Sequence, residues 1–333
     1  MITQRIAIDL GSSATRIYIP RKGVVLDEPS VIAKTPDNKI AAVGTDALEM
    51  MERTPEALLA TRPLSSGVVA DFKMTRLMLE QFIIDSIGRF RLRKPEAMIT
   101  VSSGATSTER RAVVDVAKTA GISNPFLIDA PVAAALGAGI PIADPTGNLI
   151  VHIGAGSTEI AVISLSGVVA SHSIRVGGIT IDNAIARYMR QNHKISIGAA
   201  TAEEIKRLVA SAMPRQQDET IKVQGRDTIG GMPKQIEVSS NELVDSIEGI
   251  LEQIVLGIRQ VMERTSPELV ADIVEHGMML TGGTAMLHKL DDLMRKVVGV
   301  PCIIAQDPLY CAVKGANIAM TNLDDYKKSF FVN

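Results

Sequence analysis

Tryptophan is absent from this 333-residue chain, only two cysteines occur, and aromatic residues make up 3% of it. So few aromatic side chains argue against the stacking surfaces that hold single-stranded nucleic acid. Cys302 and Cys311 lie in apolar stretches without the spacing of metal ligands, so we expect two buried thiols and no disulfide framework. A net charge of −2 gives no general attraction to nucleic acid, which we do not expect as a partner.

Long apolar runs and targeting signals are lacking as well. No run approaches the roughly 20 apolar residues that a membrane-spanning helix needs. Residues Met1–Arg5 lead directly into a strand-like segment, without the basic start and apolar stretch of a secretory signal. These absences predict a cytoplasmic protein. With 46% hydrophobic residues, the chain is long enough for two domains that each bury a core.

An internal repeat is the most informative feature that the sequence does contain. Residues 8–17 (Ile-Asp-Leu-Gly-Ser-Ser-Ala-Thr-Arg-Ile) match residues 151–160 (Val-His-Ile-Gly-Ala-Gly-Ser-Thr-Glu-Ile) in the same register. Each copy predicts a β-hairpin whose tip consists of small residues. Because Gly and Ser are common at any turn, either hairpin alone could be an ordinary one. The shared register favours two related tips with one common role.

Small residues at a tip let backbone N–H groups converge on an anion, and nearby hydroxyls add further donors. We therefore predict that the two tips grip a polyphosphate. The Gly-Ala-Gly at 154–156 also resembles the start of a dinucleotide-binding fingerprint, but a strand-like run follows it where that motif requires a helix. The residues assigned to the phosphate cradle are Gly11, Ser12, Ser13, Ala14 and Thr15 in the first tip, and Gly154, Ala155, Gly156, Ser157 and Thr158 in the second.

The rest of the chain alternates strand-like runs with helical patterns, which predicts a layered α/β architecture. The segment Pro131–Gly137 reads as a helix of small residues with proline in its first turn, suited to close packing. A capping box formed by Ser239 and Glu242 predicts a long amphipathic helix to about Arg264.

Two further segments are candidates for ligand contact. A helix beginning near Thr201 places Glu203 and Lys206 on one face, where they form either a solvated ion pair or part of a binding site. The turn Gly282–Thr284 follows a strand and is expected to lead into a helix from Ala285, so its backbone can approach a ligand closely.

The order of these features, two glycine hairpins, a Glu-x-x-Lys helix and a Gly-Gly turn, resembles the actin-like ATPase superfamily. Within it, the chain is similar to the bacterial MreB family along nearly its whole length. The stretches that carry the resemblance are Glu28–Ala33, Gly67–Phe72, Glu159–Leu165, Glu263–Leu269 and Leu280–Gly283.

The resemblance implies an actin-like α/β fold, in which two related domains of duplicated origin enclose a nucleotide cleft. We expect the first domain at residues 1–145, with a small subdomain at about 30–75. The second domain is expected at 146–333, with a small subdomain at about 185–240.

The resemblance also implies the ligands and partners. ATP or ADP would lie in the cleft with Mg²⁺, with Asp9 near the metal, and its adenosine would meet Glu203, Lys206 and the turn Gly282, Gly283 and Thr284. The chain would polymerise with itself, and with MreB paralogues where present. Its filaments would lie on the inner face of the cytoplasmic membrane and act with the cell-wall machinery to determine cell shape.

The residues of one segment indicate how the chain could contact a membrane. Segment 89–94 (Arg-Phe-Arg-Leu-Arg-Lys) alternates basic and apolar side chains where the family carries a hydrophobic loop. Phe90 and Leu92 could enter the bilayer interface while the cations meet anionic lipid, at about 1 kcal/mol per charge. The alternative is a short strand with a basic exposed face.

Two departures from the family concern hydrolysis. Ala130 stands where the family carries the glutamate that positions the attacking water, with Asp129 just before it. His152 stands where the second hairpin normally opens with an aspartate, and its partner in the internal repeat is Asp9. An alanine cannot orient water, and a neutral histidine adds no negative charge to attract Mg²⁺. Asp9 is left as the expected carboxylate of the hairpins.

We therefore predict that ATP binds but is hydrolysed weakly or not at all. The remaining catalytic candidates are Asp9, Asp71, Asp129 and Thr158. In the alternative interpretation, Asp71 or Asp129 replaces the missing glutamate and turnover is only slowed. Thr284, in place of the third glycine of the family's adenosine loop, could narrow the adenine site or place a hydroxyl beside it.

Other functions on the same fold remain open at this point. A small-molecule kinase would need a catalytic aspartate near Ala130 and His152, where the sequence offers no obvious one. An actin-like chaperone ATPase would need a substrate domain after residue 333. A filament-forming cytoskeletal protein is the expectation that fits the sequence best.

Overall fold

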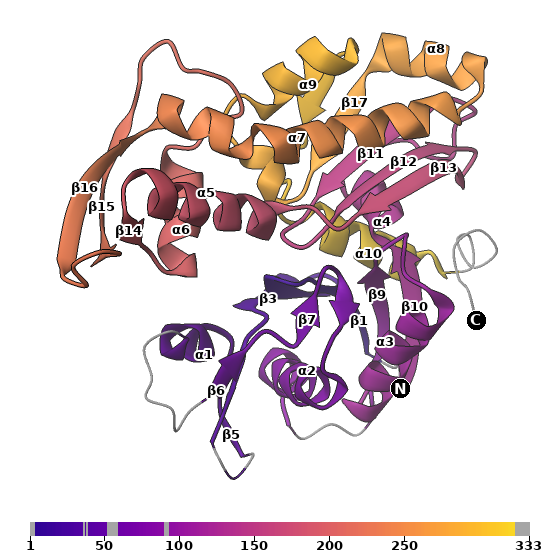
Figure 1. Cartoon of the computed structure of the whole chain (residues 1–333). Coiled ribbons are helices and arrows are strands. Elements are labelled where there is room, and N and C mark those ends of the chain that lie inside the picture. Colours follow the sequence, from indigo (N-terminus) through magenta and orange to yellow (C-terminus); the bar gives the residue numbers. More distant parts are fainter. Residues whose placement is uncertain (1–3, 36, 38, 52–58, 90–92, 324–333) are drawn as a thin grey trace.

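Two five-stranded sheets organise the molecule, as the computed structural model shows (Figure 1). The model describes residues 4–35, 37, 39–51, 59–89 and 93–323. Each sheet carries helices on its outer face, and the two sheets face each other across a pair of crossed helices (Figure 1). The layered α/β architecture expected from the sequence is confirmed.

The first sheet has the strand order β3-β2-β1-β9-β10. Strands β1 (Arg5–Leu10), β2 (Ala14–Ile19) and β3 (Gly23–Pro29) form an antiparallel meander. Strands β9 (Glu96–Val101) and β10 (Asn124–Asp129) then lie parallel to β1 on its other side. Buried side chains of β1 and β9 lie on both faces of this sheet. Ile6, Ile8, Ala97 and Ile99 face the outer helices, and Met98 faces the inner ones.

The second sheet repeats this topology in the order β13-β12-β11-β17-β18. Strands β11 (Asn148–Ile153), β12 (Thr158–Ser164) and β13 (Gly167–Ile174) form the meander. Strands β17 (Met278–Thr281) and β18 (Cys302–Ile304) lie parallel to β11. The internal repeat, visible in sequence over ten residues, therefore extends to a whole sheet.

Helices of the two domains cover the outer faces of the sheets. The first sheet packs against α2 (Phe72–Ile87) and α3 (Ser107–Thr119), and the second against α5 (Gly178–Asn192) and α7 (Ser240–Glu263). The capping box predicted for α7 is confirmed, because Ser239 and Glu242 exchange side-chain and backbone hydrogen bonds.

Two inner helices join the domains. Helix α4 (Ala130–Gly137) follows the first sheet but packs on β11 and β12 of the second, while α10 (Cys311–Thr321) follows the second sheet and packs on β1 and β9 of the first. A Cβ on Gly137 would lie 1.8 Å from the carbonyl oxygen of Cys311, and one on Gly315 would lie 1.7 Å from that of Ala133. The close packing predicted for Pro131–Gly137 is thus confirmed.

Smaller elements extend the two domains on the same side, at the left of Figure 1. Two three-stranded sheets form there, each with a helix, and a short two-stranded hairpin lies beside the first. These elements are β4 (Ile32–Lys34), β5 (Ile40–Val43), α1 (Gly44–Met50), β6 (Leu59–Thr61), β7 (Leu64–Ser65), β8 (Val68–Val69), β14 (Ile195–Ser196), α6 (Ala199–Leu208), β15 (Thr220–Asp227) and β16 (Pro233–Ser239).

The segment after the Gly282 turn differs from the prediction. The expected helix from Ala285 is only a single 3-10 turn, η1 (Gly283–Met286). The next helix, α9 (Leu290–Val298), begins after Lys289, whose left-handed φ of 56° interrupts helical geometry. A further helix, α8 (Pro267–His276), precedes β17.

The two cysteines are free and buried, as expected. Burial raises the pKa of the Cys302 thiol to about 12 and that of the Cys311 thiol to about 11. Among the described residues, no helix combines the length and apolarity that crossing a membrane requires.

Because α4 and α10 pack so closely, we expect one added methyl group at their crossing to destabilise the protein strongly. Gly315→Ala should lower the free energy of unfolding by about 3 kcal/mol, because the methyl overlaps the Ala133 carbonyl and the helices must separate. Gly249→Ala is the matched control, since it lies in α7 with nothing within 4 Å of its Cβ position. The control should stabilise by up to about 1 kcal/mol. Urea unfolding measures both, and equal effects would contradict the account of the crossing.

Candidate functional site

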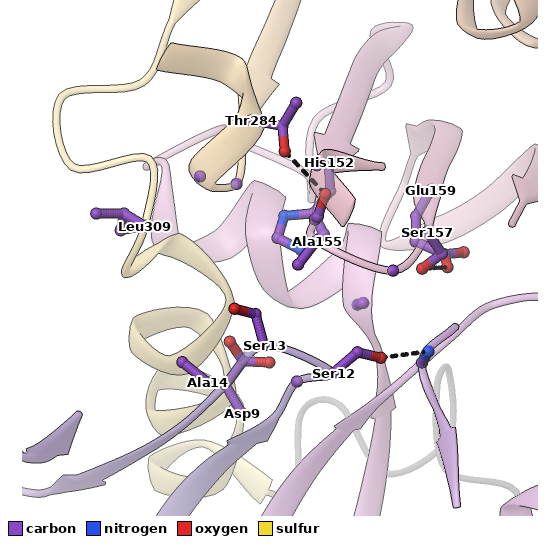
Figure 2. Close-up of a pocket in the computed structure, with 18 of the residues that line it drawn as sticks. Asp9, Ser12, Ser13, Ala14, His152, Ala155, Ser157, Glu159, Thr284 and Leu309 are labelled. Carbon is purple, nitrogen blue, oxygen red and sulfur yellow. Dashed lines mark hydrogen bonds between the residues drawn. The ribbon is translucent and has the colours of Figure 1, made fainter. Parts of the chain in front are cut away.

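A cleft of about 370 Å³ lies between the two domains, above the crossed inner helices. Both hairpin tips line it (Figure 2), together with α6 and the Gly282 turn. Of the residues assigned to ligand binding from sequence, the structure brings the following to the cleft: Asp9, Gly11, Ser12, Ser13, Ala14, Gly154, Ala155, Gly156, Ser157, Glu203, Lys206, Gly282, Gly283 and Thr284.

Thr15 and Thr158, assigned to the same cradle, lie beneath it instead. Both side chains are fully buried. The Thr15 hydroxyl is 2.8 Å from that of Ser30, and Ser30 donates to the carbonyl of Gly11 over 2.6 Å. The Thr158 hydroxyl donates to the carbonyl of Val176 over 2.8 Å. In this arrangement both threonines hold the shape of their hairpins, and neither presents its hydroxyl to the cleft.

The two tips touch each other, and a third turn joins them. The hydroxyl oxygen of Ser12 accepts a 2.8 Å hydrogen bond from the backbone N–H of Gly67. A Cβ on Gly156 would lie 2.7 Å from the same oxygen, so only glycine fits this approach. Gly67 belongs to the β7–β8 turn, where Ser66 and Gly67 both have positive φ, of 49° and 78°. The sequence prediction missed this turn, although the Ser-Gly pair between two short apolar runs is a hairpin signal.

Acidic and basic residues exchange places between the two hairpins. Asp9 pairs with Arg16 across β1 and β2, while His152 pairs with Glu159 across β11 and β12. In the internal repeat, Asp9 corresponds to His152 and Arg16 to Glu159. Figure 2 shows Asp9 and His152 pointing toward the same part of the cleft from opposite sides. Arg16 and Glu159 line the cleft as well, and the sequence prediction overlooked both.

Asp9 is already engaged on both carboxylate oxygens. The Thr100 hydroxyl donates to Oδ1 over 2.7 Å, and Nη1 of Arg16 lies 3.7 Å from Oδ2. His152 is held through Nδ1, which is 3.1 Å from the hydroxyl of Thr281. Burial lowers the pKa of His152, while the negative charges of Asp9 and Glu159 oppose that shift. The residue that replaces a carboxylate is therefore held neutral.

The sequence suggested that Asp9 is the only carboxylate of the hairpins that lies at the site. Glu159 is a second one. Its side chain is 1% exposed and accepts four hydrogen bonds. Ser157 and Ser173 donate to Oε1 over 2.9 and 3.0 Å, and Ser103 donates to Oε2 from its hydroxyl and its backbone N–H over 2.7 and 3.2 Å. A carboxylate with four donors has little remaining capacity to accept a proton or orient water.

The two aspartates proposed as substitutes for the missing glutamate lie outside the cleft lining. Asp71 caps α2, where Oδ1 accepts from the backbone N–H of Met74 over 3.0 Å. Asp129 pairs with Arg110, whose Nη2 is 2.5 Å from Oδ1. Burial raises the pKa of Asp129, and the Arg110 charge opposes the shift. Ala130 itself does line the cleft, so no carboxylate replaces it at that point of the lining.

The polar groups of Lys206 and Thr284 bind other residues of the protein. Lys206 forms a largely buried ion pair with Asp182, over 2.8 Å. It therefore does not form the solvated ion pair with Glu203 that the sequence offered as one interpretation. Burial raises the pKa of Asp182, against the opposing charge of Lys206. The Thr284 hydroxyl donates to the carbonyl of Gly154 over 2.9 Å (Figure 2). This bond fixes the Gly282 turn to the second hairpin.

Arg62 lies beside the first hairpin tip, in the same domain. It donates to the carbonyl of Ser13 over 3.0 Å. Burial lowers the pKa of Arg62, while the charges of Glu203 and Asp182 on the second domain oppose that shift. Arg62 therefore links the first tip electrostatically to the helix that carries Glu203.

The site fits a divalent cation poorly. Within the described part of the chain, no group of three or more His, Cys, Asp and Glu side chains is placed to hold a metal ion. Mg²⁺ usually needs one or two carboxylates in addition to substrate phosphates. Asp9 is already bonded to Thr100 and faces Arg16, Glu159 is saturated, and His152 is neutral. The Mg²⁺ contact that the sequence assigned to Asp9 has little support in this donor set.

Two sheets of one topology, crossed inner helices and a cleft between paired hairpins define a protein of actin-like fold. The chain belongs to the MreB/Mbl family, because the family model described as MreB/Mbl protein matches residues 3–328. It is similar to the cell shape-determining protein MreB of Escherichia coli K12, at 42% identity over 99% of this chain and 97% of the relative. The cell shape-determining protein Mbl of Bacillus subtilis is 40% identical, over 98% of this chain and 99% of the relative.

Solved structures agree with this assignment. MreB 5 of Spiroplasma citri bound to AMPPNP superposes with a TM-score of 0.93 at 31% identity, covering 98% of this chain and 99% of that one. A MamK double helical filament shares the fold, with a TM-score of 0.79 at 18% identity, covering 95% and 98%. The predicted fold and family are confirmed, as is the role of a cell-shape cytoskeletal protein, and none of the relatives named above favours the kinase alternative.

His152 predicts a pH dependence of stability. Because its pKa in the folded protein lies below the ordinary value of 6.5, the unfolded chain binds more protons as the pH falls below that value. The free energy of unfolding should therefore fall from pH 7 to pH 5. His152→Asn should reduce that fall, measured by urea unfolding at each pH. His276→Asn, at the exposed end of α8, is the control. An unchanged pH profile in His152→Asn would contradict the burial of a neutral imidazole.

Proposed function

We propose that the chain binds ATP or ADP in this cleft and polymerises into filaments that help determine cell shape. The observation that carries the proposal is the pair of glycine tips, Gly11–Ala14 and Gly154–Ser157, which face each other across one cleft. Solved MreB 5 structures from Spiroplasma citri are bound to AMPPNP and ADP, which supports a nucleotide in the corresponding place. Glu203, Lys206 and the Gly282 turn are proposed to meet the adenosine.

Hydrolysis is proposed to be weak or lost. Orienting the attacking water needs a group with free hydrogen-bonding capacity beside the terminal phosphate. Ala130 has none, His152 is neutral and bonded to Thr281, and Glu159 is saturated by serines. Asp129 is bonded to Arg110, outside the cleft lining. Nucleotide binding therefore has structural support that turnover does not.

Self-association and membrane attachment complete the proposal. The chain would assemble with copies of itself, and with paralogues of the family, on the inner face of the cytoplasmic membrane beside the cell-wall machinery. Arg89, Arg93 and Lys94 are exposed in the connection between α2 and β9, where they can meet anionic lipid. Phe90 and Leu92, the predicted membrane contacts, lie outside the described residues.

Restoring the two carboxylates tests the hydrolysis proposal. Ala130→Glu combined with His152→Asp should raise phosphate release by about tenfold or more, since positioned acid and base groups contribute on the order of 10² or more to rates. The control is Ala130→Gln with His152→Asn, which has a similar shape without charge. Phosphate release and pelleting with ATP are measured on the same samples. Wild-type turnover as fast as that of the restored variant would overturn the proposal, and failure to pellet would overturn filament formation.

A further inference from the structure

We propose that this chain binds its nucleotide without needing a divalent cation, because Arg16 supplies positive charge at the phosphates. The inference rests on the proposed nucleotide binding and goes beyond it. Arg16 lines the cleft, and the described residues around it lack the donor set for a metal. These two observations concern the same few side chains.

Arg16 lies on β2, directly across the hairpin from Asp9. Its side chain is 15% exposed and lines the cleft. Nε lies 3.0 Å from Oδ1 of Asp27, yet it has no partner in hydrogen-bonding geometry. Arg16 is therefore a largely buried cation at the cleft with an unsatisfied donor, which is an uncommon and costly arrangement without a ligand.

Surrounding residues fix the guanidinium in place. The ring of Tyr310, just before α10, lies 5.6 Å from the guanidinium carbon of Arg16. The hydroxyl of Tyr310 donates to Oδ2 of Asp27 over 3.1 Å. Arg16 is thus held between Tyr310, Asp27 and Asp9, so its side chain loses little further freedom when an anion binds.

Arg16 places a fixed positive charge on the floor of the cleft, next to Asp9. Where a pair of hairpin carboxylates would attract a metal, this cleft has Asp9 beside Arg16, and a neutral His152 opposite. An arginine keeps its charge at every physiological pH and matches phosphate oxygens with a planar fork of donors. A phosphate chain at the tips would find in Arg16 the neutralising charge that Mg²⁺ otherwise brings.

The other cations of the lining are less suited to that role. Lys206 is paired with Asp182 and also donates to the carbonyl of Gly178. Arg207 is exposed on α6, where solvent and salt screen its charge. Arg16 is therefore the buried lining cation on the hairpin side. Arg190, exposed in the last turn of α5 and outside the cleft lining, provides a control of the same residue type.

The experiment titrates a fluorescent ATP analogue with excess Mg²⁺ and with excess EDTA. For the wild type, Kd should change by less than about threefold between the two conditions. Arg16→Leu should weaken EDTA-condition binding by about tenfold or more, as expected for a lost charge-assisted contact. Arg16→Lys should keep most metal-free binding, and Arg190→Leu should stay within about threefold of the wild type. Thermal melts establish that each variant is folded.

His152→Asp adds a second test that leaves Arg16 intact. A new carboxylate opposite Asp9 should make Mg²⁺ improve binding by about tenfold. A wild-type Kd that rises tenfold or more in EDTA would overturn the inference while leaving the proposed function standing. So would folded Arg16→Leu with unchanged metal-free binding. Absence of binding in both conditions would instead overturn the proposed nucleotide binding itself.

Discussion

The contact between α4 and α10 is the constraint on which the rest of the structure depends. Each inner helix packs on the sheet of the other domain, and each has a glycine where it meets the partner's backbone. Without these glycines, the helices would have to separate and the sheets with them. Because β1 and β11 run toward the same cleft, the spacing of the sheets sets the spacing of the hairpins. The tips meet at Ser12 and Gly156 because the helices meet at Gly137 and Gly315.

The two halves share one topology, but the charged side chains of their hairpins differ. The rung just before each tip pairs an acid with a base, and the order is reversed between the halves. The reversal has unequal consequences. Asp9 is neutralised by Arg16 on the floor of the cleft, whereas Glu159 is stabilised by serines from both domains and His152 remains neutral. The backbone cradle survives this change because glycine N–H groups do not depend on side-chain charge.

Local signals predicted the fold well, and long-range contacts limited the prediction of the site. The hairpins and the α7 capping box depend on neighbouring residues and were recovered from sequence. The four donors of Glu159 come from three segments, so its saturation has no local signature. Asp71 and Asp129 were candidates for the missing glutamate because of their positions in the sequence. In the structure, Asp71 caps α2 and Asp129 forms an ion pair with Arg110. The helix predicted from Ala285 does not form, because Thr284 hydrogen-bonds to Gly154 and Lys289 adopts a left-handed conformation.

The contacts that close the cleft are of a different kind from those that hold the domains together. The crossing of the inner helices is apolar and close-packed, so it resists separation. At the cleft itself, the domains meet through hydroxyls, as in the contacts of Ser102 with Ser173 and of Ser103 with Glu159. A bond between two neutral hydroxyls, such as that of Ser102 with Ser173, contributes about 1 kcal/mol. A ligand that engages both tips therefore adds contacts between the domains at the cleft, whether or not it is hydrolysed.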